Sequence, residues 1–247
     1  MSLSEANLDQ IPEISFVIPA RNEELLLTST IQSITEAVTA CGVTSEVIVS
    51  NDASDDATAE IARECGASVV DVELHNIGAV RNAGAAIANG RMIFFLDADT
   101  QLPAATLKAV LKEVEEGAVG GGCAVEFDEN ITWFQRKLSH IFLAYWQRYS
   151  GWAAGCSIYV LREVFEEVGG FDTTQFAAEE RYLSEAIRKQ GKFVIVKEPV
   201  LTSARKLRIY STWYLLKVAA HAMFVKRWNL KDRSGLEIFY DAPREKE

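Results

Sequence analysis

The 247-residue sequence has no long hydrophobic run. The nearest approach, residues 212–225, is interrupted by Lys217 and His221, and no window reaches 18 consecutive apolar residues. This absence argues against a membrane-spanning helix. The first ten residues are polar and acidic, without the basic and then apolar arrangement of a signal peptide. We therefore expect a cytoplasmic protein, with peripheral contact with the inner face of the cell membrane as an alternative.

Cysteine and basic residues are also scarce. The four cysteines form no Cys-x-x-Cys pair and have no nearby histidine at metal spacing, so a zinc site is disfavoured and buried thiols in a reducing compartment are expected. The sequence holds 25 Lys and Arg against 35 Asp and Glu, a formal charge of -10, which argues against a nucleic-acid-binding surface. No G-x-G-x-x-G or G-K-[ST] sequence follows a predicted strand, which disfavours dinucleotide and Walker-type sites.

What is present indicates one globular α/β domain over residues 1–247, with a mixed central sheet flanked by helices. In the first hundred residues, apolar runs at 14–19, 46–50, 68–71 and 92–96 predict strands, and periodic stretches at 23–40, 57–64 and 78–88 predict helices. In the second half, we expect strands at 119–127, 157–160, 193–196 and 200–202, and helices at 104–116, 131–149, 162 onward, 179–190 and 210–228.

Polar residues gather directly after the predicted strands, where ligands bind in open α/β sheets. Helix caps or first-turn acids explain each cluster singly, but not four clusters in succession. In the fourth cluster, Asp97 and Asp99 are two residues apart, so in an extended segment both carboxylates point to one side and suit Mg2+ or Mn2+. An ordinary turn is the alternative for this pair. The clusters are Pro19–Glu24, Asn51–Asp56, His75–Asn82 and Asp97–Asp99.

These segments together resemble glycosyltransferase family 2, whose members have the nucleotide-binding GT-A fold. The similarity extends to about residue 203. Its motifs are the opening strand with the Pro-x-x-Asn-Glu turn at 15–24, the Val-Ile-Val-Ser-Asn-Asp-Ala-Ser segment at 47–54, and the stretch from Asn76 to Asp99 that ends in the DxD sequence. Two departures are Asn51, where the family often has Asp, and Ala53, where it often has Gly. Ala53 makes the turn geometry less certain than a glycine would.

For residues 12–100, the resemblance implies a half that binds a nucleotide-diphosphate sugar. Asp52 would read the base edge, Asp99 would ligate Mg2+ or Mn2+, and Asp97 would lie against the ribose or in the metal shell. Arg81 would lie near the base or the diphosphate. The nucleotide-binding residues implied in full are Pro19, Ala20, Arg21, Glu23, Asp52, Arg81, Asp97 and Ala98.

For residues 101–203, the resemblance implies the acceptor and catalytic half. Glu179 and Glu180 fall where many members carry Glu-Asp, and Glu180 would then be the general base that takes the proton of the acceptor hydroxyl. Glu179 remains a rival because Glu is one methylene longer than Asp. Two acids in the first turn of a helix, favoured by its dipole, are the simpler alternative.

The remaining residues, about 204–247, form a basic tail predicted to be helical. Residues 1–202 hold 15 basic and 30 acidic side chains, whereas residues 203–233 hold 8 basic and 1 acidic. This contrast suggests an anionic neighbour, and Arg205 and Lys206 are the candidate phosphate contacts. Aromatic residues within 131–149 and 210–228 fit an acceptor wall, a dimer face or an interfacial anchor, with core packing as the plain alternative.

We therefore predict a metal-dependent, inverting glycosyltransferase that moves a sugar from a nucleotide-diphosphate sugar, UDP-sugar before GDP-sugar, to a hydroxyl acceptor in cell-surface glycan or glycolipid synthesis. The acceptor is a sugar, a lipid-linked sugar or a polyprenyl phosphate, and a membrane surface and a homodimer are further candidate contacts. A haloacid-dehalogenase-like phosphatase that uses Asp97 and Asp99 is one alternative, because residues 94–100 also resemble its nucleophile loop. A nucleotide-sugar-binding protein without turnover is the other.

Overall fold

The computed structural model describes residues 11–128, 151–174 and 178–205. Its first half alternates strands with helices, because short buried apolar runs are separated by amphipathic segments. Neither half contains, within these ranges, a helix long and apolar enough to cross a bilayer. The elements in order are β1 (Ile14–Ala20), α1 (Leu27–Cys41), β2 (Ser45–Asp52), α2 (Thr58–Glu64), β3 (Ser68–Val72), α3 (Ile77–Ala85) and β4 (Met92–Leu96), then β5 (Thr100–Gln101), α4 (Ala104–Glu115), β6 (Ala118–Phe127), β7 (Ser157–Leu161), α6 (Arg162–Glu167), α7 (Glu179–Gln190) and β8 (Lys192–Thr202).

The strands form one eight-stranded mixed sheet in the order β3-β2-β1-β4-β7-β6-β8-β5. The first four strands run parallel, and β7 then pairs antiparallel with both β4 and β6. All seven residues of β1 and all five of β4 are buried, as expected for central strands covered on both faces. The carboxyl ends of β1, β2 and β4 therefore meet at one edge, where the polar clusters lie.

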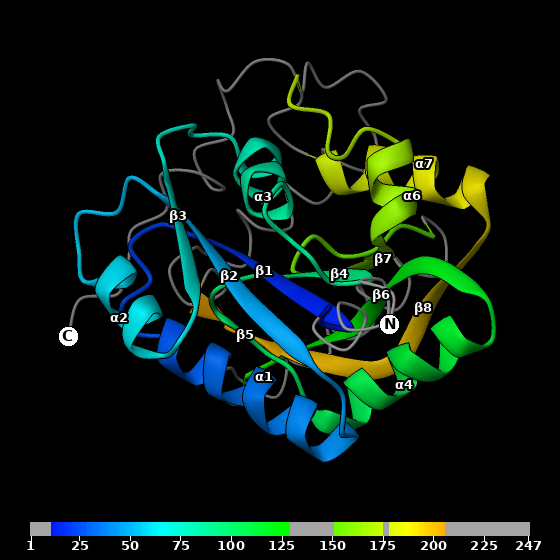
Figure 1. The fold of residues 1–247 in the computed structure, drawn as a ribbon, viewed down its shortest axis with the longest axis horizontal. Helices are drawn as coiled ribbons and strands as arrows, with labels where there is room; N and C mark the ends of the chain where they lie inside the picture. The colour runs from blue at the N-terminus through cyan, green and yellow to red at the C-terminus, as the bar shows by residue number, and fades with distance from the viewer. Residues whose placement is uncertain (1–10, 129–150, 175–177, 206–247) are drawn as a thin grey trace, which may run out of the picture.

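Helices cover both faces of this sheet (Figure 1). Helices α1 and α4 lie on one face, over a core that includes Phe16, Phe94 and Tyr159. Helices α3, α6 and α7 lie on the other face, over a second core that includes Phe95 and Phe165. The strand residues alternate between the two cores because successive side chains point to opposite faces of a sheet.

The predicted strands and helices agree with the structure in kind, and several bounds differ. Helix α1 begins at Leu27, four residues after the predicted start. The prediction of two strands near 193–196 and 200–202 was wrong, because β8 is one strand of 11 residues with a pairing irregularity between Cys123 and Ala124 of β6. Of the four cysteines, only Cys123 is fully buried and the others are half-buried, with all four thiols free. The predicted helices at 131–149 and 210–228 lie outside the described residues.

Candidate active site

The backbone at the strand ends has an uncommon conformation. Among the described residues, four non-glycine residues have positive φ. Each lies in a loop that follows a strand of the sheet or directly precedes a helix. Such conformations cost of order 1 kcal/mol or more and often lie at functional sites. Three of them lie in the predicted polar clusters, and the fourth directly precedes Glu179. The four residues are Asn22 (φ 55°), Ala53 (51°), His75 (49°) and Ala178 (57°).

Asp52, at the end of β2, is buried and fixes the loop after β3. Its carboxylate accepts hydrogen bonds from the backbone N–H of Leu74, at 2.7 Å, and of His75, at 3.1 Å. His75 Nδ1 in turn lies 2.9 Å from Arg21 Nη1. This arrangement joins the first three polar clusters, and the half-exposed Arg21 and His75 side chains form part of its surface.

The two departures from the family pattern are accommodated locally. Ala53 adopts the left-handed conformation at φ 51°, and its N–H donates to the carbonyl oxygen of Val72 at 2.9 Å. The Asn51 side chain donates from Nδ2 to Asp71 Oδ1 at 2.8 Å. The turn that a glycine would make most easily is therefore made here by alanine at a modest cost.

Arg81, in the middle of α3, lies at the centre of a buried ion-pair network. Its side chain is 3% exposed, with Nη2 2.9 Å from Asp97 Oδ1 and Nη1 2.7 Å from Glu179 Oε1. Nη2 also donates to the carbonyl oxygen of Gly155 at 2.8 Å, and the guanidinium lies 5.3 Å from the ring centroid of Phe171. Burial alone would lower the pKa of Arg81. The neighbouring carboxylates raise it by more than burial lowers it, so the pKa lies above its usual value and the side chain stays charged.

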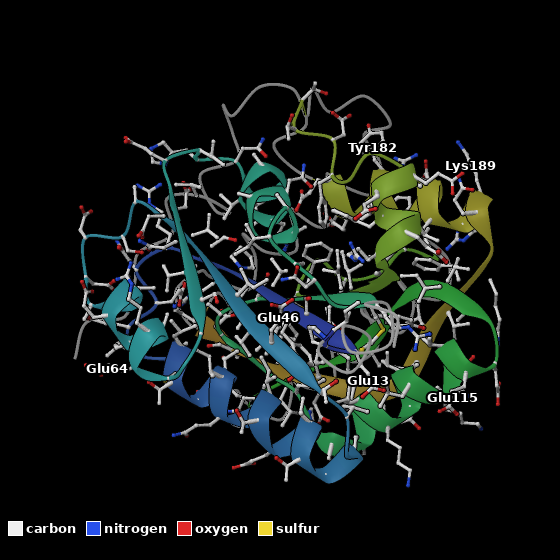
Figure 2. The ribbon with its side chains drawn as sticks, in the orientation of Figure 1. Glu13, Glu46, Glu64, Glu115, Tyr182 and Lys189 are labelled. Atoms are coloured by element: carbon white, nitrogen blue, oxygen red, sulfur yellow. The ribbon has the colours of Figure 1, made fainter. Side chains whose placement is uncertain are left out.

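Glu180 is the second residue of α7, directly after Glu179. Burial and the adjacent Glu179 carboxylate raise the pKa of Glu180 from its usual value to about 8, and Arg81 opposes this shift. Glu180 is half-buried, whereas Glu179 is 5% exposed and bound to Arg81. Tyr182, two residues after Glu180, reaches the molecular surface from α7 (Figure 2). A carboxylate with a raised pKa at the edge of a buried network suits proton transfer near neutral pH.

Asp99 lies in a second ion-pair network with Glu23 and Arg205. Arg205 binds both carboxylate oxygens of Glu23, at 2.9 and 3.0 Å, and its Nη2 lies 3.4 Å from Asp99 Oδ2. The Arg205 and Glu23 side chains are 7% and 8% exposed. Arg205, predicted as a phosphate contact, is therefore held in a buried pair beside the DxD sequence, and Lys206 lies outside the described residues.

The DxD residues suit a divalent metal in their chemistry. Asp97 and Asp99 supply hard carboxylate oxygens from one short loop, and their side chains are 32% and 18% exposed, so part of each faces the open side of the site. Asp97 uses one oxygen, Oδ1, in its pair with Arg81. In the described part of the chain, no third His, Cys, Asp or Glu joins them in a group able to hold a metal.

The other predicted nucleotide-binding residues are built into the sheet edge. Pro19 and Ala20 end β1 and are buried, and Ala98 is buried with its carbonyl oxygen accepting a 2.8 Å hydrogen bond from Thr30. The sequence analysis missed Gly155, whose carbonyl oxygen holds Arg81. No pattern marks it, because this contact joins residues 74 positions apart.

Comparison with known proteins shows which family this chain resembles. The model of glycosyl transferase family 2 matches residues 15–182. An undecaprenyl-phosphate 4-deoxy-4-formamido-L-arabinose transferase of Enterobacter sp. (strain 638) is 30% identical over 155 residues, which are 60% of this chain and 47% of that protein. A 4,4'-diaponeurosporenoate glycosyltransferase of Staphylococcus haemolyticus (strain JCSC1435) is 38% identical over 96 residues, 36% of this chain and 24% of that protein. The chain thus spans less than half the length of these relatives.

Solved structures confirm the predicted GT-A fold. The mannosyltransferase PcManGT from Pyrobaculum calidifontis, in complex with GDP-Man and Mn2+, superposes with a TM-score of 0.61 at 20% identity and covers 92% of this chain and 68% of that one. S. aureus TarS 1-349 in complex with UDP gives 0.60 at 15% identity, covering 88% and 67%. Glucosyl-3-phosphoglycerate synthase from Mycobacterium tuberculosis, with Mn2+, UDP and glucosyl-3-phosphoglycerate, gives 0.56 at 21% identity, covering 89% and 80%.

Proposed function

The chain belongs to glycosyl transferase family 2, and from this premise we propose that it transfers a sugar from a UDP-sugar to a hydroxyl acceptor with inversion at the anomeric carbon. One observation supports this most directly. Asp97, which would serve the donor, and Glu179, which directly precedes the acid that would serve the acceptor, Glu180, come from opposite halves of the chain and are both bound by Arg81.

In the proposed reaction, Glu180 accepts the proton of the acceptor hydroxyl. The hydroxyl oxygen forms a bond to the anomeric carbon while the bond from that carbon to the diphosphate oxygen breaks, so UDP leaves with the bonding electron pair. Glu179 is less suited to this role because Arg81 already binds its Oε1 at 2.7 Å and its side chain is buried. The half-buried Glu180 has a raised pKa and is the stronger proton acceptor once it is ionised.

Asp99 and Asp97 would hold the divalent metal, which when bound neutralises the negative charge that develops on the diphosphate. Two solved structures with this fold carry Mn2+ together with GDP-Man or UDP, which supports Mn2+ as the first metal to test. Asp52 anchors the loop that carries His75, so this loop and Arg21 would line the place for the nucleobase.

For the acceptor, we propose a polyprenyl phosphate or a lipid-linked sugar. The support is the similarity to the undecaprenyl-phosphate transferase, together with the basic composition of residues 203–233. A protein that binds such an acceptor would touch the inner face of the cell membrane.

Nucleotide binding is the first test. Isothermal titration of the protein with UDP, and separately with GDP, in the presence of Mn2+ should show binding, with UDP tighter. The matched variant Asp99→Asn should lose the Mn2+-dependent part of the affinity. Absence of binding by either nucleotide would overturn the proposal. The anomeric configuration of the product, read by NMR, tests inversion.

The two alternatives make different predictions. A phosphatase would release inorganic phosphate with Mg2+, yet its nucleophile loop normally follows the first strand, whereas Asp97 follows β4 after three α/β units. A binding protein without turnover would bind UDP-sugar and never hydrolyse it. Slow donor hydrolysis that is lost in Glu180→Gln, with binding retained, distinguishes the transferase from both.

A further inference from the structure

Arg81 is the most completely enclosed charged residue of the site, and the family resemblance would place it against the nucleotide. Its surroundings differ from that expectation. Both of its Nη atoms are bound to protein groups, and the side chain is 3% exposed. A guanidinium enclosed in this way has little surface with which to meet a nucleotide.

The partners of Arg81 come from segments far apart in the sequence. Asp97 follows β4, Glu179 is the first residue of α7, and Gly155 precedes β7. Helices α3 and α7 lie on the same face of the sheet (Figure 1). A Cβ at Gly78 of α3 would lie 3.2 Å from the Cβ of Phe171, a tight contact, and 3.6 Å from the Cγ of Glu179, an ordinary one, so α3 passes close to the start of α7. Arg81 thus connects the DxD loop to the start of α7.

The charges in this network divide the two acids of α7 between different roles. The guanidinium of Arg81 binds both Asp97 and Glu179. The Glu179 carboxylate therefore has a charged hydrogen-bond partner and is held in one orientation. Glu180 lies beside this network, because a Cβ at Gly155 would lie 3.6 Å from Arg81 Nη2 and 4.0 Å from Glu180 Oε2. Glu180 therefore lies next to the network that orients Glu179, on its more exposed side.

We propose that Arg81 is a positioning residue of the transfer reaction, and that it acts by locking Glu179 to Asp97 so that Glu180 is held at a fixed place relative to the donor. Glu179 is then a second positioning residue, and Glu180 is the one acid of the pair that touches the reacting atoms. This inference rests on the proposed function and sharpens it, because it takes Arg81 out of the nucleotide contact and assigns it to the geometry of proton transfer.

The test compares nucleotide binding with turnover in Arg81→Lys, which keeps the positive charge but loses the planar fork that binds two carboxylates at once. UDP affinity is measured by isothermal titration with Mn2+, and turnover is measured as hydrolysis of the UDP-sugar that the wild type uses. We expect a UDP Kd and a donor KM within about twofold of wild type, and a kcat about 10²-fold lower, since displacement of a reacting group by about 1 Å costs that much. Arg63→Lys, which alters an exposed ion pair on α2, is the matched control.

Glu179→Gln and Glu180→Gln complete the design and remain informative if Arg81→Lys fails to fold. In Glu179→Gln the amide oxygen can still accept the hydrogen bond from Arg81, so we expect about a tenfold loss of kcat. In Glu180→Gln the side chain cannot take a proton, so we expect a loss of kcat of about 10²-fold to 10⁴-fold with UDP affinity retained.

The outcomes separate the inference from the function on which it rests. A UDP Kd raised tenfold or more in a folded Arg81→Lys would show that Arg81 binds the nucleotide, and would overturn the inference while leaving the transferase in place. A larger loss of kcat in Glu179→Gln than in Glu180→Gln would also overturn it. Failure of the wild type to bind UDP or GDP would instead refute the proposed function.

Discussion

The raised pKa of Glu180 predicts that this residue lowers the stability of the folded chain as the pH rises. In the unfolded chain, the pKa of Glu180 is near its usual value of 4.5, whereas burial and Glu179 raise it to about 8 in the folded chain. Between these two values the folded state binds a proton that the unfolded state has lost. The contribution of Glu180 is therefore most favourable below pH 4.5 and is lost as the pH rises through 8.

The magnitude follows from proton linkage. When the folded chain binds one proton more than the unfolded chain, the free energy of unfolding falls by about 1.4 kcal/mol for each unit of rising pH. Relative to Glu180→Gln, which does not titrate, the unfolding free energy of the wild type should fall by at most about 1.4 kcal/mol per unit between pH 5 and 7. We treat this slope as an upper limit because Glu180 is half-buried and water screens part of the effect. Arg81 and Glu179 are the charged groups that face it and stay unchanged in the variant.

Urea denaturation of both proteins at pH 5, 6, 7 and 8, followed by circular dichroism, measures this difference. The two free energies should diverge as the pH rises and become parallel above pH 8. The exposed Glu167→Gln variant of α6 provides the matched control for loss of one carboxylate. Curves for wild type and Glu180→Gln that stay parallel, within about 0.5 kcal/mol across this range, would refute the account of Glu180. In the same range, donor hydrolysis by the wild type should accelerate as Glu180 loses its proton.

Three further predictions concern the rest of the site. Asp99→Asn should remove most of the Mn2+-induced rise in thermal unfolding temperature, because the amide is a weaker metal ligand than the carboxylate; an unchanged shift would place the metal elsewhere. Arg205→Lys should lower the urea midpoint through loss of the bidentate pair with Glu23, and a midpoint equal to wild type would show that the pair contributes nothing measurable. Gly84→Ala should destabilise the sheet by about 1–3 kcal/mol, since its Cβ would lie 2.4 Å from Ser50 Oγ; thermal unfolding at the wild-type temperature would contradict this.

The sequence predicted the elements best where burial alone determines them. The strand at 92–96 is apolar throughout and agrees with β4 at both ends. Helix α1 begins later than its periodicity suggests, because Asn22 has φ 55° and the Glu23 N–H donates to the side chain of Thr58, 35 residues away. Tertiary contacts of this kind are invisible to a local pattern. Likewise, two strands were predicted at 193–196 and 200–202, yet one strand continues through Pro199 with an irregular pairing.

The candidate site shows the same limit at the level of charge. The resemblance to the family was enough to name Asp97, Glu179 and Arg81 as candidates, because its motifs occur in order along the sequence. The contacts between these residues could not be predicted from the sequence, because Arg81 is 16 positions from Asp97 and 98 positions from Glu179. An arginine among phosphate-binding motifs is expected to face the nucleotide, but this one is buried and is bound by the half-buried Asp97 and the buried Glu179. This burial of Arg81, visible only in the folded chain, distinguishes Glu179, which Arg81 binds, from its neighbour Glu180. Comparison of Glu179→Gln with Glu180→Gln therefore tests which of the two is the general base.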